Sequence, residues 1–382
     1  MSQAATLTRR IDAAIDRAIA EKRIVGAVVL VNQDGKEVYA RAAGELDREA
    51  GVAMPRDAIF RLASFTKPIV AAAVLALVDQ GKLGLDDAVA KWLPDFRPKL
   101  RDGAVPEIRI RQLLSHTSGL AYGTLLPDDP YRLAKVCNAL DQPGLSLEEN
   151  LRRLAHVPLL FAPGTAWRYG LSIDVLGAII EKVTGGSLGS AVATLVTGPL
   201  GMRDTTFGVT DMRRLAIPYA DGRNGPIRMG EPQIVRDDPA MALTFSPTRI
   251  LDPKSYQSGG AGMAGTAGDF MKFMEAIRNG GVPILKRETV ALAGQNQIGD
   301  LPRDETEAGW RFGFLSAVMA DPAAAKSPHS VGTLEWGGAY GHRWFIDPTE
   351  RLSVVYLTNT AMEGVSGAFP IEMREAVYGR TG

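Results

Sequence analysis

The sequence predicts an α+β fold, an α/β sandwich in which one antiparallel sheet is built from both ends of the chain and flanked by helices. Strand-like runs gather before residue 62 and after about residue 305, whereas the stretch between them carries helical patterns and loops rich in proline, glycine and aspartate. Strands at both ends with helices between them indicate that a mainly helical domain is inserted into the sheet domain. We therefore expect an α/β domain of residues 1–86 and 256–382, an inserted helical domain of residues 87–255, and an active site in the cleft between them.

The first elements are a helix and a hairpin. Ile11, Ile15 and Ile19 recur at helical spacing with charges between them, which predicts an amphipathic helix over residues 6–22. Two β-rich runs at residues 24–31 and 36–39 flank an Asp-Gly pair and predict a β-hairpin. The helix that follows begins at Ser64, and Gly81 is expected to end it.

In the middle of the chain, the sequence predicts five helices and one irregular segment. The helices are expected at residues 108–114, 145–156, 173–183, 188–196 and 267–279. Ser146 with Glu149 three residues later is a capping-box pattern and marks the start of the second of these helices. Residues 222–262 contain five prolines, and so long a loop inside a compact domain indicates a function, so we expect it to form one wall of the substrate cleft.

Strand character returns near the end of the chain. The runs are spaced like a meander, at residues 311–319, 332–336, 342–347 and 352–357, and a last helix is expected at 369–378.

Charge and cysteine content exclude several classes of function. Lys and Arg number 43 and so do Asp and Glu, so no net charge favours nucleic acid or anionic lipid as a partner. The single cysteine, Cys137, rules out an intrachain disulfide, and no His, Cys or Asp cluster has the spacing of a metal site. We expect no metal, no cofactor and no membrane segment. The N-terminal stretch has no apolar export signal, which predicts a cytoplasmic protein.

Ser64-Phe-Thr-Lys67 is the stretch whose side chains are best suited to catalysis. Positions i and i+3 share one face of a helix, so the hydroxyl and the amine would point to the same place. The apolar run after it, residues 69–78, is too short to span a bilayer and predicts a buried helix. The serine would lie at the positive end of the helix dipole. By itself the pattern also fits an N-cap serine beside a solvent-facing lysine.

Three further stretches follow in a particular order, and together they carry a resemblance. They are Leu113-Leu-Ser-His-Thr-Ser-Gly-Leu120, the motif Pro163-Gly-Thr-Ala-Trp-Arg-Tyr169, and Trp336-Gly-Gly-Ala339 on a late strand. With Ser64-x-x-Lys67 they make the chain similar to the serine β-lactamase-like, penicillin-binding superfamily. Within it the chain most resembles the family VIII carboxylesterases, which share the class C β-lactamase fold. The resemblance covers nearly the whole chain.

Two departures from the class C β-lactamase pattern indicate the subclass. Where those enzymes carry Tyr-x-Asn, this chain has Tyr169-Gly-Leu171, and where they carry Lys-Thr-Gly it has Trp336-Gly-Gly338. The missing amide and ammonium would pair with the carboxylate of a β-lactam through charge-assisted hydrogen bonds. Their loss leaves an apolar, aromatic wall that favours a neutral ester.

The resemblance implies acyl transfer through a serine ester. Ser64 would be the nucleophile, Lys67 and Tyr169 would share the role of base, and the backbone N–H groups of Ser64 and Ala339 would hold the oxyanion. Whether the lysine or the tyrosine takes the proton stays open. The side chains and backbone expected to contact substrate are those of Trp336, Gly337, Gly338, Leu171, Phe65 and His342.

Two other residues have simpler interpretations. Gly185-Gly-Ser187-Leu-Gly189 matches the nucleophile elbow of α/β-hydrolases, but a helical pattern precedes it, so Ser187 is interpreted as a helix N-cap. His116 is interpreted as part of a structural turn.

Several functions fit these motifs. The leading hypothesis is a carboxylesterase for short-chain or neutral esters, with weak β-lactam cleavage as a side activity. An acyltransferase would use the same acyl-enzyme, and a class C-type β-lactamase or D-Ala-D-Ala peptidase would use the same serine. A silent binding relative would be expected to lack Ser64, Lys67 or Tyr169, and all three are present. The expected partner is a small-molecule ester, and the sequence leaves open whether the protein is a monomer or a homodimer.

Overall fold

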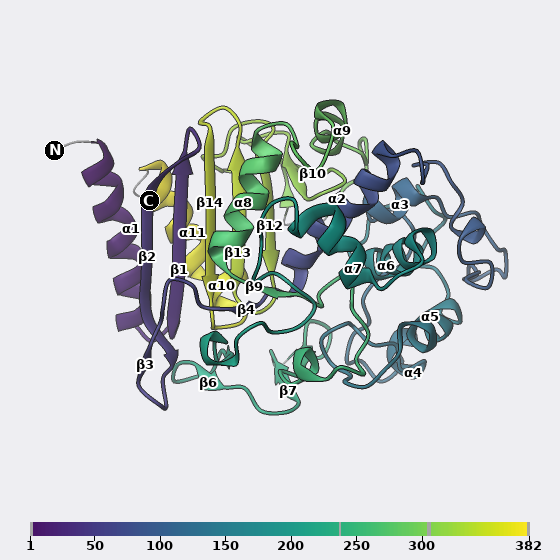
Figure 1. The fold of residues 1–382 in the computed structure, drawn as a ribbon. Helices are drawn as coiled ribbons and strands as arrows, with labels where there is room; N and C mark the ends of the chain where they lie inside the picture. The colour runs from purple at the N-terminus through teal and green to yellow at the C-terminus, as the bar shows by residue number, and fades with distance from the viewer. Residues whose placement is uncertain (1–2, 237, 304–306, 380–382) are drawn as a thin grey trace.

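An eight-stranded antiparallel sheet occupies one side of the structure, and helices from the middle of the chain lie beside it (Figure 1). The computed structural model describes residues 3–236, 238–303 and 307–379. The strands run in the order β10-β11-β12-β13-β14-β1-β2-β3. Their bounds are β1 Gly26–Gln33, β2 Lys36–Asp47, β3 Val52–Ala53, β10 Trp310–Phe312, β11 Ala317–Met319, β12 Leu334–Gly338, β13 His342–Asp347 and β14 Leu352–Thr358. The predicted sheet from both ends of the chain is therefore confirmed.

The two ends of the chain meet in the middle of this sheet. Strand β1 pairs along its length with β14, from Ala27 opposite Thr358 to Gln33 opposite Leu352. Along β1, alternate residues point to opposite faces. Val29 and Val31 pack with helices α1 (Gln3–Ala20) and α11 (Ala368–Tyr378) in one core, whereas Val28 and Leu30 pack with α2 (Thr66–Asp79) and α8 (Ala267–Arg278) in the other. Because both faces are covered, nearly every residue of β1 is buried.

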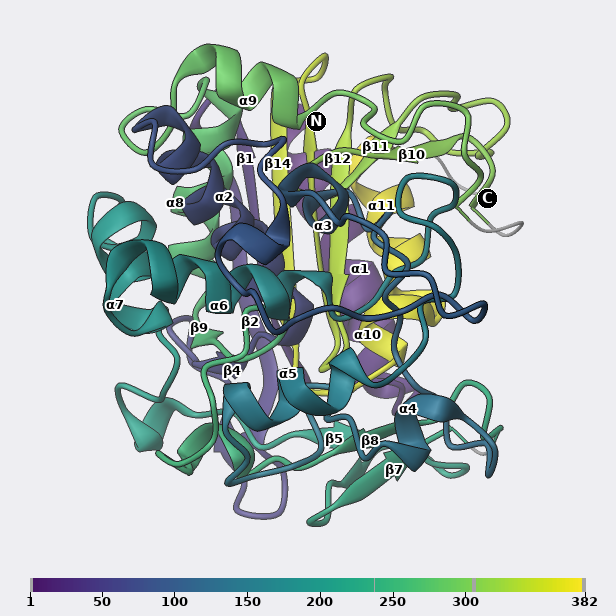
Figure 2. The ribbon, with the colours of Figure 1, turned by 90° about the vertical axis from the view of Figure 1, so that its right-hand side faces the viewer.

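Helices cover both faces of the sheet. Figure 2 shows α2 and α8 on one side, with α10 and α11 on the other. The helix bounds are α1 Gln3–Ala20, α2 Thr66–Asp79, α3 Ile110–Leu114, α4 Pro130–Leu133, α5 Leu147–Ala155, α6 Ser172–Thr184, α7 Leu188–Val192, α8 Ala267–Arg278, α9 Arg287–Ala293, α10 Glu363–Ser366 and α11 Ala368–Tyr378. In the described part of the chain, no helix is long and apolar enough to cross a membrane.

Most of the regular structure between the two halves of the sheet is helical, and the same region contains short paired strands. These are β4 Phe60–Arg61 with β9 Ala264–Gly265, β5 Tyr219–Ala220 with β6 Ile227–Arg228, and β7 Gln233–Val235 with β8 Leu243–Phe245. The segment predicted to be irregular, residues 222–262, thus contains small hairpins. One of its residues, Arg236, lines the cavity described below, in agreement with the expected cleft wall.

Several sequence-based boundaries are wrong, and at two of them the type of element also differs. The run 311–319 was expected to be one strand, but it is a hairpin of β10 and β11, because Gly313 N–H bonds to the carbonyl of Ser316 and reverses the chain. The helix expected over residues 188–196 is an α-helix only to Val192, and it continues as a single π-helical turn at Ala193–Thr197.

Candidate active site

Ser64 lies on a tight turn at the start of a buried helix. The turn is the 3₁₀ helix Ala63–Phe65, and α2 begins directly after it. Residues Thr66 to Leu77 of α2 are all buried, as expected for a helix that is apolar all round. Ala63 has a φ of 45°, in the left-handed region that residues with a Cβ seldom adopt. The turn leaves Ser64 partly exposed between two buried neighbours.

Lys67 is buried beside Ser64, and its amine makes three hydrogen bonds. Its Nζ lies 3.1 Å from Ser64 Oγ, 2.9 Å from the Tyr122 hydroxyl and 2.8 Å from the Gly260 carbonyl oxygen. Three acceptors match the three donors of an ammonium group. Lys67 is 3% exposed, so its amine makes these hydrogen bonds out of contact with bulk water. The prediction that the Ser64 hydroxyl and the Lys67 amine lie side by side is confirmed.

Tyr122 was missed by the sequence analysis. It follows α3 in a loop whose backbone touches the Tyr169 loop, since a Cβ on Gly170 would come within 2.4 Å of Ala121 Cα. Burial, together with Tyr169 and Asp174 nearby, raises the pKa of Tyr122 well above its usual value, so its phenol stays neutral. The only signal in the sequence was its position two residues after the second motif.

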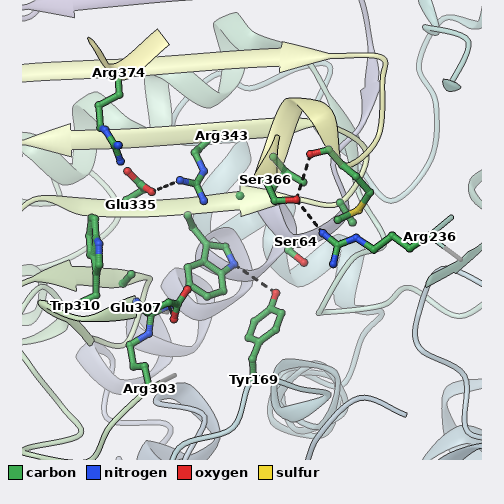
Figure 3. A pocket seen from close by; sticks show the side chains of 16 residues that line it. Ser64, Tyr169, Arg236, Arg303, Glu307, Trp310, Glu335, Arg343, Ser366 and Arg374 are labelled. Atoms are coloured by element: carbon green, nitrogen blue, oxygen red, sulfur yellow. Dashed lines mark hydrogen bonds and ion pairs between the residues drawn. The ribbon is translucent and has the colours of Figure 1, made fainter. Parts of the chain in front are cut away.

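Tyr169 faces Lys67 through its ring. Lys67 Nζ lies 4.6 Å from the centroid of the Tyr169 ring, a cation–π distance. The Tyr169 hydroxyl accepts a 3.4 Å hydrogen bond from Nε1 of Trp336 (Figure 3). Tyr169 and Ser64 line the same cavity, so the three residues predicted to act together are brought together.

Aromatic rings form one wall of this cavity. The Trp336 ring packs edge-to-face on Tyr169 and on Phe312, with centroids 5.0 and 5.2 Å apart. His116 lies behind them, its ring 4.9 Å from Tyr169. Burial, with the charges of Lys67 and Arg303, lowers the pKa of His116 well below its usual value. A neutral, buried His116 agrees with the structural role expected for it.

The end of β12 lies against the Ser64 turn. A Cβ on Gly338 would come within 2.6 Å of the carbonyl oxygen of Leu62, so only glycine allows this approach without a shift of backbone. The next residue, Ala339, lines the same cavity as Ser64. The two backbone positions expected to form the oxyanion hole, Ser64 and Ala339, therefore line the same cavity.

Three residues expected to contact substrate are buried instead. Phe65, Leu171 and His342 are at most 1% exposed, which contradicts a direct contact. Phe65 faces away from the cavity because it packs on Phe270 and His342 in the core. His342 Nε2 bonds to the carbonyl oxygen of Arg61 at 2.8 Å, and burial lowers the pKa of His342 to about 4. Leu171 is the buried N-cap residue of α6 and lines a different cavity. Gly338 is also buried and acts through its approach to Leu62.

The cavity beside Ser64 has a volume of about 400 Å³, which suits a small organic substrate. Its lining extends to charged residues that the motifs did not indicate. Glu335 bonds to Arg343 Nη1 at 2.5 Å and to His329 Nε2 at 2.8 Å. Burial alone would raise the pKa of Glu335, but the Arg343 guanidinium, the His329 bond and the charge of Arg374 outweigh it and hold the pKa at about 2.

A buried carboxylate lies beneath Lys67. Asp174 of α6 is 1% exposed, and its Oδ1 accepts a 2.6 Å bond from Ser258, while Oδ2 has no hydrogen-bond partner. A Cβ on Gly260 would come within 2.4 Å of that Oδ2 and 3.5 Å of Lys67 Nζ, so both charged groups border the same glycine. Burial raises the pKa of Asp174, and the charge of Lys67 works against this.

Ser187 lies at the start of α7, where its Oγ accepts a hydrogen bond from the N–H of Ser190. The N-cap interpretation is confirmed, and Ser187 belongs to no nucleophile elbow.

Comparison with known proteins places the chain in a known group. It matches the Beta-lactamase family over residues 11–371. It is 49% identical to Esterase EstB of Burkholderia gladioli over 380 residues, which cover 99% of this chain and 96% of that protein.

Solved structures agree with the fold. EstCE1, described as a hydrolase with promiscuous acyltransferase activity, superimposes with a TM-score of 0.93 at 42% identity, covering 98% of this chain and 99% of that one. Unliganded simvastatin synthase from Aspergillus terreus superimposes with a TM-score of 0.76 at 22% identity, covering 99% and 98%. At that identity the second likeness concerns the fold alone.

Proposed function

Because the chain belongs to the Beta-lactamase family, we propose that it is a serine carboxylesterase of the family VIII type, with Ser64-x-x-Lys67 as its nucleophile motif. The observation that carries the proposal is the 3.1 Å contact between Lys67 Nζ and Ser64 Oγ at the edge of a cavity walled by Trp336 and Tyr169. An esterase and a hydrolase among its close relatives support this reaction class.

In the first half of the reaction, Ser64 Oγ attacks the ester carbonyl, and its proton passes to the Lys67–Tyr169 pair. Lys67 can receive this proton only as a neutral amine, which has two N–H donors for the Tyr122 hydroxyl and the Gly260 carbonyl and a free electron pair for the proton of Ser64. Burial raises the pKa of Tyr122 and favours its neutral phenol, so we assign Tyr122 an orienting role and not that of the base. It acts by orienting Lys67 through their 2.9 Å contact.

The negative charge that develops on the carbonyl oxygen is held by the backbone N–H groups of Ser64 and Ala339. The alcohol leaves with the proton that Ser64 gave up, and the acyl group remains on Ser64. Water then attacks this ester, gives its proton to the same pair, and releases the acid as Ser64 regains its hydrogen.

An acyltransferase reaction differs only in the second step, where an alcohol replaces water. The acyltransferase activity in the description of EstCE1 supports this as a second activity. The domain division at residues 1–86 with 256–382 and 87–255, the cytoplasmic location and the monomeric or homodimeric state stay predictions.

The test compares p-nitrophenyl acetate, butyrate and octanoate with nitrocefin, using the wild type and Ser64→Ala. Fast cleavage of the esters that disappears in Ser64→Ala, with slow or absent nitrocefin turnover, is the expected result. Nitrocefin turnover equal to that of the esters would instead favour a β-lactamase. Full esterase activity in Ser64→Ala would contradict the assignment of the nucleophile.

A further inference from the structure

The cavity beside Ser64 is rich in arginine, although the protein as a whole has no net charge. Among its described lining residues, arginines outnumber acids: Arg236, Arg303, Arg343 and Arg374 against Glu307 and Glu335. A cleft lined by an excess of one charge attracts the opposite charge. This is unexpected next to an aromatic wall suited to neutral esters.

Two of these arginines are matched by the two glutamates. Arg303 pairs with Glu307 at 2.7 Å, and Arg343 pairs with Glu335. Each oxygen of Glu335 already accepts a hydrogen bond, one from Arg343 and one from His329. The charge of Arg374 also helps to lower the pKa of Glu335, so this one carboxylate faces two guanidinium groups, those of Arg343 and Arg374.

Among the described lining residues, Arg236 and Arg374 of α11 are the two arginines that form no close ion pair with a carboxylate, and Arg236 instead donates a 2.9 Å hydrogen bond to Ser366 Oγ. The Nε of Arg374 is buried and has no hydrogen-bond partner, and among the described residues no carboxylate forms a close ion pair with its guanidinium. In Figure 3 it points toward Glu335 and Arg343 on the far side of β12 from Tyr169. A half-buried guanidinium that lines a cavity, has an unbonded Nε and shares Glu335 with Arg343 is suited to bind a further anion, most favourably a planar carboxylate.

The edge of β12 connects this arginine to the reacting centre. Strand β11 pairs with β12 only at Leu334 and Glu335, so the described strands leave the β12 edge beyond them open to the cavity. Arg343 lies opposite Gly337, two residues from Ala339, and Glu335 lies four residues from Ala339. At about 3.3 Å per residue, the cation cluster lies roughly 7 to 13 Å along the strand from the oxyanion position.

We propose that this cavity binds esters that carry a second, ionised carboxylate, held by Arg374 with Arg343 beside it. The inference rests on the proposed esterase function and adds a substrate class to it. An extended chain advances about 1.2 Å per bond, so the spacing fits a carboxylate about six to eleven bonds from the reacting carbonyl. Neutral esters would still react, without this additional contact.

The experiment uses two matched pairs of esters, one for each side of the ester bond. Mono-p-nitrophenyl suberate and p-nitrophenyl octanoate have acyl chains of equal length and differ in a terminal carboxylate. The acetate ester of 8-hydroxyoctanoate and octyl acetate differ in the same way on the alcohol side. We expect kcat/KM about tenfold higher for the acid member of one pair at low ionic strength, and a smaller ratio at high salt.

Three variants test the residue. Arg374→Met should abolish the preference while leaving the neutral esters unaffected, and Arg374→Lys should keep part of it. Arg213→Met, at an arginine that is 89% exposed and remote from the cavity lining, removes the same charge and should change nothing. Thermal unfolding of each variant shows that it is folded.

Equal rates for both members of each pair, or a preference that Arg374→Met leaves intact, would overturn the inference while the esterase function stands. Failure of the wild type to cleave any of the four esters would overturn the proposed function, and the inference with it.

Discussion

The glycine at position 338 offers a test of how the oxyanion hole is built. An alanine Cβ there would lie 2.6 Å from the Leu62 carbonyl oxygen, about 0.8 Å short of ordinary contact, which begins at 3.4 Å. That oxygen accepts the 3.1 Å hydrogen bond from Phe65 N–H that closes the Ser64 turn. The turn and β12 must therefore move apart to admit the methyl group, and the N–H groups of Ser64 and Ala339 separate with them.

The expected loss follows from this displacement. Misplacement of a reacting group by about 1 Å can lower the rate about 10²-fold. Loss of one oxyanion donor costs about 10² to 10³ in kcat, or roughly 3 to 4 kcal/mol. We therefore expect Gly338→Ala to lower kcat for p-nitrophenyl butyrate about 10²-fold, with a smaller change in KM.

The neighbouring glycine is the matched control. A Cβ on Gly337 would meet the end of the Val365 side chain at 2.5 Å, and Val365 is only partly buried, so a side-chain shift can admit it. Gly337→Ala should therefore lose less than about tenfold in kcat. If Gly338→Ala is folded by thermal melting yet keeps kcat within about threefold of the wild type, the reasoning about this contact is refuted.

Three further predictions follow from the same region. Tyr122→Phe removes one of the three acceptors of Lys67, so kcat should fall about tenfold while KM stays similar; steady-state kinetics with p-nitrophenyl butyrate measure this, and an unchanged kcat would exclude an orienting role. Asp174→Asn removes a carboxylate whose pKa is raised by burial, so it relieves a cost of ionisation that the folded state bears at neutral pH, and urea unfolding should show no loss of stability. A marked loss of stability would show instead that the Asp174 carboxylate is needed beside the charge of Lys67. The pKa of Glu335 is lowered from 4.5 to about 2, so this carboxylate stabilises the fold fully above pH 4.5 and its contribution of about 3 kcal/mol disappears as the pH falls toward 2. Urea unfolding of the wild type and Glu335→Gln at pH 6 and pH 3 should show a large difference at pH 6 that narrows at pH 3, and a constant difference would argue against the ion pair with Arg343.

Local spacing was enough to predict the part of the site that lies within one helix. Ser64 and Lys67 are three residues apart, and helical geometry alone brings them together. The antiparallel sheet was also predictable, because strand patterns at both ends of the chain leave few other arrangements. Tyr169 required the motif around it, since a single tyrosine has no local signature.

Side-chain direction and long-range contacts could not be read from the sequence in the same way. Phe65 and His342 adjoin motif residues, yet both point into the core, because adjacent positions on a helix or strand face different sides. Tyr122, Asp174 and Arg374 reach the site from three separate elements. Only the folded backbone brings them within reach of Ser64 and its cavity.

The pairing of β1 with β14 has a consequence for the assembly of the chain. Residues 27–33 find their partners more than 300 positions later, at residues 352–358. Contacts so distant in sequence slow folding, because a long loop must close before they form. During synthesis, β14 cannot pair with β1 until almost the whole polypeptide has emerged. Strand β12, which packs against the Ser64 turn, is also synthesised late. The nascent protein therefore exposes an open sheet edge through most of its translation, which makes it a natural client for chaperones.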